Sequence, residues 1–335
     1  MKNGLLVYSD KYEYFNIGDY IQSLAAKQYF KEIDVYVCRE QLDTYFGDDV
    51  KMIFNGWFTH EPDNWPPSLH IHPLFVSFHI NSVAAEKLTN VTSISYLKKY
   101  EPIGCRDKKT AELLKALNVN AYFSGCLTLT LGKIYKRKDP DGKIYFVDPH
   151  FKANKDIKYI TKYLITLLTK YRIIKIISNK MYNTTNMHSM LKASAFYGTY
   201  SNIFSDDVLT NAEYLCQEMR SSEISNHENR FLFAENLLDK YCSANFIVTS
   251  RIHCALPCLG IGTPVLYVEN QQQAETSHCR LDGLRELLHT IKCNGSELTF
   301  NLTSKKITQN YKFSNKTDYQ VLADNLEKAC TVFCK

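Results

Sequence analysis

The amino-acid sequence predicts an α/β fold in two halves, each with a parallel sheet, followed by a C-terminal helix. Short apolar segments typical of strands alternate with longer segments of helical spacing along most of the 335 residues. The alternation stops once, at Tyr135–Lys143, a charged segment with Pro and Gly that is typical of a linker. A chain of this length can bury two cores, so we expect one domain over residues 1–135 and a second over residues 144–335.

The first half carries the strand segments of a parallel sheet and the helices that join them. Asp19 is a typical N-cap for a helix over Tyr20–Phe30, and Arg106-Asp107 opens another over Lys108–Leu117. A further helix is expected to end near Tyr100. The predicted strands are Gly4–Ser9, Asp34–Cys38, Lys51–Phe54, Leu74–Ile80 and Pro102–Cys105.

The second half repeats this alternation. Residues 179–205 are polar and irregular, which indicates a loop or a partly helical insertion. Apolar residues at close to helical spacing predict the C-terminal helix over Thr317–Phe333. The other predicted elements are strands at Ile144–Val147 and Arg172–Ser178, and helices near Asp207–Met219, Ile157–Thr169, Asn229–Tyr241 and Leu281–Ile291.

The most informative stretch is Ala244–Val268. Two short apolar β-type segments flank an apolar segment of helix length, which predicts a strand–helix–strand unit of a parallel sheet. Arg251 and His253 interrupt the apolar run where the first strand meets the helix. Ligands bind outside the carboxyl ends of such strands, and a helix N-terminus favours anions. The stretch therefore predicts an anion site that contains a titratable group, although either residue alone is more often a cap or a packed surface residue.

Composition limits the classes of protein to consider. Apolar residues make up 45% of the chain and the net charge is +5, which fits a folded globular protein. The lysines are scattered, so nucleic acid is not an expected partner. A cationic cleft for a small anion, or weak attraction to anionic lipid, fits this charge as well. Because no signal peptide and no apolar stretch of roughly 20 residues is visible, we expect a cytoplasmic protein.

Cysteine and histidine spacing predicts no metal site. The 11 cysteines include no CxxC pair, and no histidine completes a zinc pattern near Cys254 and Cys258. We interpret the cysteines as reduced, mostly buried thiols of a cytosolic protein. His60, His70 and His72 lie in or beside a Pro-rich loop with acidic neighbours, but no ligand spacing supports a metal there.

Several motifs occur at predicted strand ends and helix starts. They are Asn16-Ile17-Gly18-Asp19, Asn55-Gly56-Trp57-Phe58, Ser77-Phe78-His79-Ile80-Asn81, Gly104-Cys105-Arg106-Asp107, and Ser250-Arg251-Ile252-His253 followed by Leu259-Gly260-Ile261-Gly262-Thr263-Pro264. With these motifs the chain resembles the polysaccharide pyruvyl transferases over most of residues 1–290. The resemblance implies an enzyme that moves the enolpyruvyl group of phosphoenolpyruvate onto two hydroxyls of a sugar and leaves a pyruvate ketal. It also implies donor-binding residues at Arg106, Arg251 and His253.

The same resemblance, together with fold analogy, bears on the architecture. Two α/β halves and a C-terminal helix suggest two Rossmann-like domains that face each other across a cleft, as in the GT-B fold. The donor would then lie against the second domain and the acceptor against the first. No cofactor is expected, because phosphoenolpyruvate is itself the donor substrate.

The donor sets the chemistry that these residues would perform. Phosphoenolpyruvate carries a carboxylate and a phosphate, and the forked guanidinium of Arg suits both. Arg106 and Arg251 are the candidates, although a salt bridge with Asp107 explains Arg106 equally well. Ketal formation needs a proton on the methylene carbon, and His253 is the best general acid because its unperturbed pKa lies near neutrality. Neighbouring arginines would lower that pKa and a bound dianion would raise it, and we expect the second effect to win in the complex.

The sugar acceptor is expected against the first half. Asp19 can hydrogen-bond a hydroxyl or act as a base, although capping of the helix explains it equally well. Gly18 lets the chain turn tightly and a ligand come close. Trp57 can stack on a sugar ring, whereas Trp57 and His79 also fit an ordinary core. The predicted substrate-binding residues are Asn16, Gly18, Asp19, Asn55, Trp57 and His79.

Other interpretations stay open. A GT-B glycosyltransferase would use the same helix start to hold the diphosphate of a nucleotide sugar, and a non-catalytic binding protein of glycan assembly could keep the same fold. A dinucleotide enzyme is disfavoured, because no Gly-x-Gly-x-x-Gly follows the first strand. His150, Glu275 and His278 are further candidates at the lip of the second half. The resemblance suggests a surface polysaccharide or its lipid-linked precursor as acceptor, handled at the inner face of the membrane, and leaves a peripheral membrane contact open.

Overall fold

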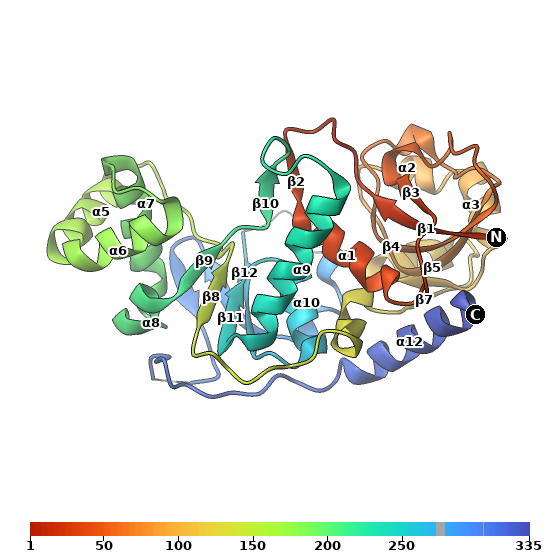
Figure 1. The fold of residues 1–335 in the computed structure, drawn as a ribbon. Coiled ribbons are helices and arrows are strands. Elements are labelled where there is room, and N and C mark those ends of the chain that lie inside the picture. The colour runs from red at the N-terminus through yellow and green to blue at the C-terminus, as the bar shows by residue number, and fades with distance from the viewer. Residues whose placement is uncertain (273–278, 304) are drawn as a thin grey trace.

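Two six-stranded sheets, each covered by helices, make up the body of the molecule (Figure 1). The structure is a computed structural model that describes residues 1–272, 279–303 and 305–335. Both sheets are parallel except at one edge strand, so the predicted α/β class with parallel-sheet cores is confirmed. In the described ranges, no helix combines the length and the hydrophobicity needed to cross a bilayer.

The first sheet has the strand order β3-β1-β4-β5-β6-β7, and all its pairs are parallel. Its strands are β1 (Lys2–Val7), β3 (Val35–Cys38), β4 (Val50–Phe58), β5 (Ile71–Ile80), β6 (Ile103–Cys105) and β7 (Ala121–Phe123). Its helices are α1 (Ile17–Lys27), α2 (Ala85–Leu88), α3 (Val91–Lys98) and α4 (Lys108–Ala116). Every strand predicted in this half is therefore present, and β4 runs on through Asn55–Phe58 with a register shift between Phe54 and Gly56.

The start of α1 corrects one prediction. The N-cap is Asn16, whose side-chain oxygen accepts a hydrogen bond from the Gly18 amide, so the helix begins at Ile17 and not at Tyr20. Asp19 lies in the first turn and does not cap the helix. Asn and Asp are equally good N-caps, so the sequence did not distinguish them, and the choice frees the Asp19 carboxylate for other contacts.

The second sheet has the strand order β14-β13-β12-β11-β8-β9, with only β14 antiparallel. At its centre, β11 (Phe246–Thr249), α10 (Ile252–Ile261) and β12 (Val265–Asn270) form the predicted strand–helix–strand unit. Gly262 ends α10 at a φ of 88°, a left-handed conformation that favours glycine. The other strands are β8 (Ile144–Val147), β9 (Glu213–Leu215), β13 (His289–Asn294) and β14 (Glu297–Thr299), and a separate pair joins β2 (Tyr14–Asn16) to β10 (Glu218–Arg220).

Three predictions in this half were wrong. Arg172–Ser178 is not a strand but part of α6 (Tyr171–Tyr182), because its buried residues Ile174, Ile177 and Ser178 follow helical spacing that the run of isoleucines concealed. The helix predicted over Asp207–Met219 ends early, as α8 (Asp206–Asn211), and β9 and β10 follow it. Leu281–Ile291 has leucines at helical spacing, but Gly283 has a φ of 83°, and the chain forms a short 3-10 helix and β13 instead.

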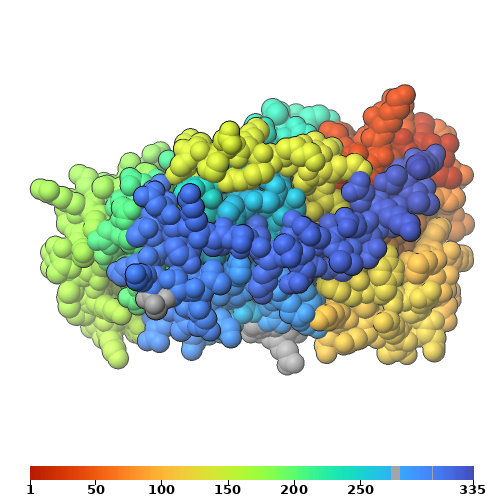
Figure 2. All heavy atoms as spheres, turned by 90° about the horizontal axis from the view of Figure 1, so that it is seen from below, coloured from red at the N-terminus to blue at the C-terminus, as the bar shows by residue number. Residues whose placement is uncertain are grey.

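The remaining helices of the second half were predicted at or close to their positions. These are α5 (Ile157–Thr169), α9 (His227–Ser243) and α12 (Gln320–Cys334), and the irregular segment 179–205 contains α7 (Met187–Tyr200). Helices α5, α6 and α7 pack on one another and form a lobe at the end of the molecule far from the first sheet (Figure 1). The C-terminal segment crosses the underside of both halves, and α12 reaches the first half near the N-terminus (Figures 1 and 2).

A close backbone contact joins the two halves. The 3-10 helix η3 (Leu127–Lys133), which follows the first sheet, packs against α10 of the second. A Cβ atom on Gly132 would lie 1.9 Å from the Gly260 carbonyl oxygen, and one on Gly260 would lie 2.3 Å from the Leu129 carbonyl oxygen. Only glycine fits at either position. Gly260, part of the motif that follows His253, thus serves the contact between the halves.

Gly260→Ala is expected to lower the free energy of unfolding by about 2–3 kcal/mol, because the added methyl group would overlap backbone that cannot move as a side chain can. Gly198→Ala, on α7, is the matched control, since a Cβ there meets no atom within 4 Å. It should leave stability unchanged or raise it by up to about 1 kcal/mol. Urea denaturation of both variants measures the free energy of unfolding. If Gly260→Ala and Gly198→Ala changed it equally, the close contact at Gly260 would be contradicted.

Candidate functional site

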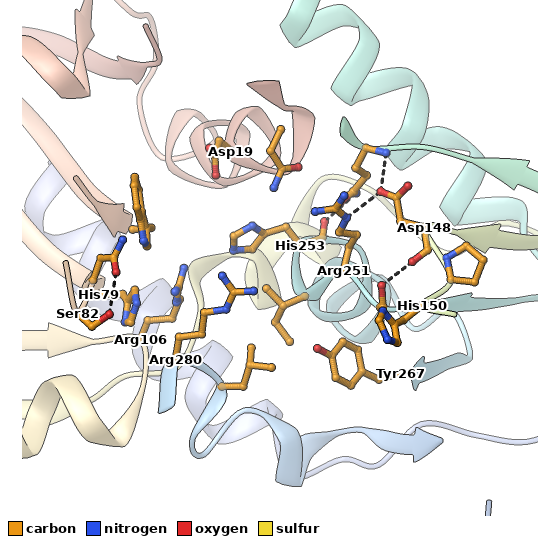
Figure 3. A pocket seen from close by; sticks show the side chains of 18 of the residues that line it. Asp19, His79, Ser82, Arg106, Asp148, His150, Arg251, His253, Tyr267 and Arg280 are labelled. Carbon is orange, nitrogen blue, oxygen red and sulfur yellow. Dashed lines mark hydrogen bonds and ion pairs between the residues drawn. The ribbon is translucent and has the colours of Figure 1, made fainter. Parts of the chain in front are cut away.

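A cavity of about 790 Å³ lies between the two sheets, at the carboxyl ends of their strands (Figure 3). Parallel sheets commonly bind ligands at this edge, and the volume is large enough for more than one small substrate. The first half contributes Asn16, Asp19, Trp57, His60, His79, Asn81 and Arg106, and the second half contributes Asp148, His150, Gln217, Arg251, His253, Tyr267 and Arg280, among others.

His253 lies at the start of α10 and its ring faces the cavity (Figure 3). It is buried, and its Nε2 atom has no hydrogen-bond partner among the described residues. Burial lowers the pKa of His253 well below its usual value, and the positive charges of Arg106, Arg280 and Arg251 lower it further. The sequence predicted the effect of arginines, but burial is the larger cause. His253 is therefore neutral in the empty site.

Arg106 follows β6, and its backbone amide bonds to the Phe78 carbonyl oxygen. Its side chain is only 3% exposed, yet its Nε has no hydrogen-bond partner and no carboxylate forms an ion pair with it in the described part of the chain. Burial lowers its pKa from the usual value. The salt bridge with Asp107 does not form, because Asp107 is engaged elsewhere. A buried cation without a counter-ion is costly unless a ligand supplies one, so Arg106 is a candidate anion-binding residue.

Arg251 also lines the cavity, but it is held by two carboxylates. Its Nε donates to Asp148 Oδ2 at 2.8 Å and its NH2 group to Glu218 Oε2 at 3.0 Å. Asp148 follows β8 and Glu218 begins β10, so Arg251 ties these segments to the end of β11. Sequence spacing gave no sign of this pairing, because the partners are 103 and 33 residues away.

Arg280 is the site residue that the sequence reasoning missed most clearly. It lies in the 3-10 helix η4 (Cys279–Leu281), and its side chain reaches toward the His253 ring together with that of Arg106 (Figure 3). It lowers the pKa of His253 more than Arg251 does. No strand end or cap signal accompanies Arg280 in the sequence, and its place in the cavity follows only from the fold.

His79 ends β5 and is paired with Asp107, the N-cap of α4. Its Nδ1 lies 2.6 Å from Asp107 Oδ2, while Asp107 Oδ1 accepts a hydrogen bond from the Thr110 amide. Burial, then the charge of Arg106, lowers the pKa of His79 to about 4, so the ring is neutral near pH 7. Because Nδ1 is engaged, Nε2 is the nitrogen of this cavity-lining histidine that remains for a ligand.

The other predicted binding residues divide into two groups. Asn16, Asp19 and Trp57 line the cavity. Asn16 also caps α1, and the guanidinium of Arg39 lies 4.7 Å from the Trp57 ring centroid, so one face of that ring is covered. Burial raises the pKa of Asp19, which favours its protonated form more than in an exposed carboxyl.

Gly18 and Asn55 do not line the cavity. Asn55 is buried and donates from Nδ2 to the Gln22 carbonyl oxygen at 2.8 Å, which ties β4 to α1. A Cβ on Gly18 would lie 2.9 Å from Cβ of His253, so this glycine leaves room for the histidine and not for a ligand. We predicted that Gly18 and Asn55 contact the substrate, whereas in the structure both support neighbouring residues of the site.

The remaining candidates are the histidines beside the Pro-rich loop and the residues at the lip of the second half. His70 and His72 lie near Asp49 on the surface, whereas His60 contacts Trp57 and lines the cavity. Across the described ranges, no cluster of three or more His, Cys, Asp or Glu side chains could hold a metal ion. Every cysteine whose side chain the structure describes is free. His150 lines the cavity, and Glu275 and His278 lie outside the described residues.

Comparison with known families gives a match over most of the chain. The family described as polysaccharide pyruvyl transferase matches residues 16–272, which include every cavity-lining residue named above except Arg280. A comparison with curated proteins finds no matching relative.

His79→Gln is expected to weaken the loss of stability in acid. The pKa of His79 is about 4 in the folded protein and near 6.5 in the unfolded chain, so between these values the unfolded state binds more protons. The free energy of unfolding should therefore fall as the pH drops from 6.5 toward 4, by up to about 1.4 kcal/mol per pH unit for this group. His253 contributes to the same dependence of unfolding free energy on pH. His79→Gln should therefore make that dependence less steep without removing it. Urea unfolding over this pH range measures the slope, and His188→Gln, on the exposed face of α7, should leave it unchanged.

Proposed function

Because the chain belongs to the polysaccharide pyruvyl transferase family, we propose that it transfers the enolpyruvyl group of phosphoenolpyruvate onto two hydroxyls of a sugar and leaves a pyruvate ketal. The observation that carries this proposal is the buried, unpaired guanidinium of Arg106 beside the unpartnered Nε2 of His253. A small dianionic donor would neutralise the first and hydrogen-bond the second.

The donor would be held by the cations around His253. Arg106 and Arg280 are the main candidates, since their side chains reach toward the His253 ring (Figure 3). Arg251 would contribute a weaker field, because Asp148 and Glu218 already offset its charge. The carboxylate and phosphate of phosphoenolpyruvate provide two separate groups for two forked guanidiniums.

His253 would deliver the first proton. Binding of a dianion adjacent to the ring would raise the pKa that burial and the arginines hold low in the empty site. The imidazolium would then protonate the methylene carbon of phosphoenolpyruvate and make the adjacent carbon electrophilic. Protonation of the His253 ring would thus depend on donor binding.

The sugar would complete the reaction in two additions. One hydroxyl adds to the electrophilic carbon and loses its proton, the bond from that carbon to the phosphate oxygen breaks, and the second hydroxyl adds and loses its proton. One hydroxyl proton balances the proton delivered to carbon, and the other leaves on phosphate. The product is a ketal that carries a methyl group and a carboxylate.

Two groups on the first half are suited to take the hydroxyl protons. His79 is neutral and is oriented by Asp107, as a general base requires, and Asp19 lies in the same wall of the cavity. The acceptor would therefore lie against Asn16, Asp19, Trp57 and His79, opposite the donor cations. We propose a sugar of a surface polysaccharide or its lipid-linked precursor as this acceptor.

We also propose that the two halves are Rossmann-like domains in a GT-B arrangement, with boundaries at residues 1–135 and 144–335. Two sheets that meet with their carboxyl ends at one cavity support this arrangement. Residues from both halves would have to approach the same substrates, so catalysis would need the cavity to close around them and exclude water.

His253→Gln and Arg106→Gln are each expected to lower turnover about 100-fold or more, since one removes the proton donor and the other the buried cation. The assay incubates the protein with phosphoenolpyruvate and a panel of galactose- and mannose-ended acceptors, and mass spectrometry detects the added pyruvyl group. His188→Gln, far from the cavity, is the control and should keep full activity. Stabilisation of the protein by nucleotide sugars and not by phosphoenolpyruvate would contradict the proposal in favour of glycosyl transfer.

Binding of phosphoenolpyruvate is expected to draw up to one proton from solution, because the pKa of His253 rises from well below its usual value when the dianion binds. The affinity should accordingly increase as the pH falls through the neutral range. Calorimetry in buffers of different ionisation enthalpy measures the proton uptake. His253→Gln should bind without that uptake, and an unchanged uptake in this variant would remove His253 from the proton transfer.

A further inference from the structure

Helix α5 exposes an apolar stripe that the described residues leave largely uncovered. Ile157 is 83% exposed, Leu168 is 80% exposed and Ile165 is 57% exposed, with Leu164 beside them. These positions recur at the spacing of one helix face. An adjacent face already packs, since Tyr163 and Leu167 are buried and Leu167 belongs to the core of the lobe. A surface helix ordinarily turns polar residues outward, so this second apolar face requires its own explanation.

Positive charge lies along one side of the stripe and near both ends of the helix. Residues 152–175 contain seven basic residues and one acidic residue, a net charge of +6, against +5 for the whole chain. Lys158 and Lys162 follow the stripe along one side of α5. Lys170, at the C-terminal end of the helix, is the one basic residue here for which an ion pair is found within the described residues, to Asp206. Aliphatic side chains bordered by lysines are typical of helices that lie in a membrane interface.

We propose that α5 is a docking surface for an anionic lipid bilayer. Its aliphatic stripe would enter the boundary between headgroups and acyl chains, and Lys158 and Lys162 would contact lipid phosphates. With 13 residues the helix is about 20 Å long, shorter than the roughly 30 Å of a hydrocarbon core, so it would lie along the surface. Tyr171 and Ile176 of α6 are also exposed and extend the same surface.

The chemistry of this surface favours a bilayer over a protein partner. Interfaces between proteins are enriched in aromatic residues and Arg and depleted in Lys, whereas here aliphatic residues and lysines dominate. A second copy of the chain would bring the same positive charge against itself. The lobe of α5–α7 also stands at one end of the molecule, where a flat surface can approach it (Figure 1).

The position of α5 relates this surface to the cavity. Phe151 lines the cavity, and only five residues separate it from Ile157, so the start of α5 lies within about 20 Å of the cavity wall. This part of the inference rests on the proposed function: a bilayer bound at α5 would hold a lipid-linked sugar acceptor near the donor site.

The test is sedimentation of the full chain with vesicles of neutral phosphatidylcholine, and with vesicles that also contain an anionic phospholipid. The wild-type protein should bind the anionic vesicles and not the neutral ones, and added salt should weaken binding. Leu164→Ser/Leu168→Ser and Lys158→Glu/Lys162→Glu should each lower binding tenfold or more. Because these side chains are exposed, the thermal unfolding temperature of the variants should stay near that of the wild type.

Matched controls carry the same changes on other helices. Val91→Ser/Val321→Ser removes two similarly exposed apolar residues from α3 and α12, and Lys98→Glu/Lys99→Glu makes the same charge change at the end of α3. Both should bind anionic vesicles within about twofold of the wild type. The proposal would be overturned if the wild-type protein bound no vesicles or bound neutral and anionic vesicles equally. It would also be overturned if the control variants lost as much vesicle binding as the α5 variants, or if the protein bound an acidic polypeptide in place of vesicles.

A second readout separates this proposal from the proposed function. Pyruvyl transfer to a water-soluble acceptor should be the same in the α5 variants as in the wild type, since α5 contributes no side chain to the cavity. Vesicle binding without any pyruvyl transfer would contradict the proposed function and leave the lipid surface standing. Loss of transfer to the soluble acceptor in the α5 variants would instead assign α5 a part in the site and contradict the docking role.

Discussion

The burial of an unpaired positive charge at Arg106 is the constraint on which the site depends. Taking a guanidinium out of water costs several kcal/mol, and a nearby carboxylate would ordinarily offset that cost. Here the adjacent Asp107 is turned away, toward His79 and the amide of Thr110. Burial, and after it the charges of Arg106, Arg280 and Arg251, holds the pKa of His253 well below its usual value, so its ring is neutral. The unpaired charge of Arg106 and the burial of His253 together set the electrostatic character of the cavity.

The parallel sheets explain how residues so far apart in sequence meet. Trp57, His79 and Arg106 stand at or just after the ends of β4, β5 and β6, and Asp148 and Arg251 follow β8 and β11. Each of these strands places a side chain at the carboxyl edge of its sheet. The residues that support these side chains lie behind them, away from the cavity. Gly18 leaves space for the His253 ring, and Asn55 ties β4 to α1. Mutations of supporting residues such as Gly18 and Asn55 would disturb the site although these residues do not line the cavity.

The sequence predicted those parts of the fold and site that depend on neighbouring residues. The unit of β11, α10 and β12 was clear because its apolar run is long and is interrupted only at Arg251 and His253. The isoleucines of α6 led to the wrong prediction of a strand, because packing in the lobe outweighs the preference of isoleucine for strands. Arg280 and the carboxylate partners of Arg251 could not be predicted, since only the folded chain brings them to the cavity.

The contact of Gly132 with Gly260 limits how the two halves can move. Two backbones that touch without side chains between them cannot slide past each other as side-chain layers can. This crossing acts together with the packing of α1 against α9 and α10, which also holds the two halves together. Helix α10 begins at Ile252, beside His253, and Gly260 lies near its other end, so one helix connects the cavity to this crossing. A substitution at this crossing would therefore act on the cavity through a single helix.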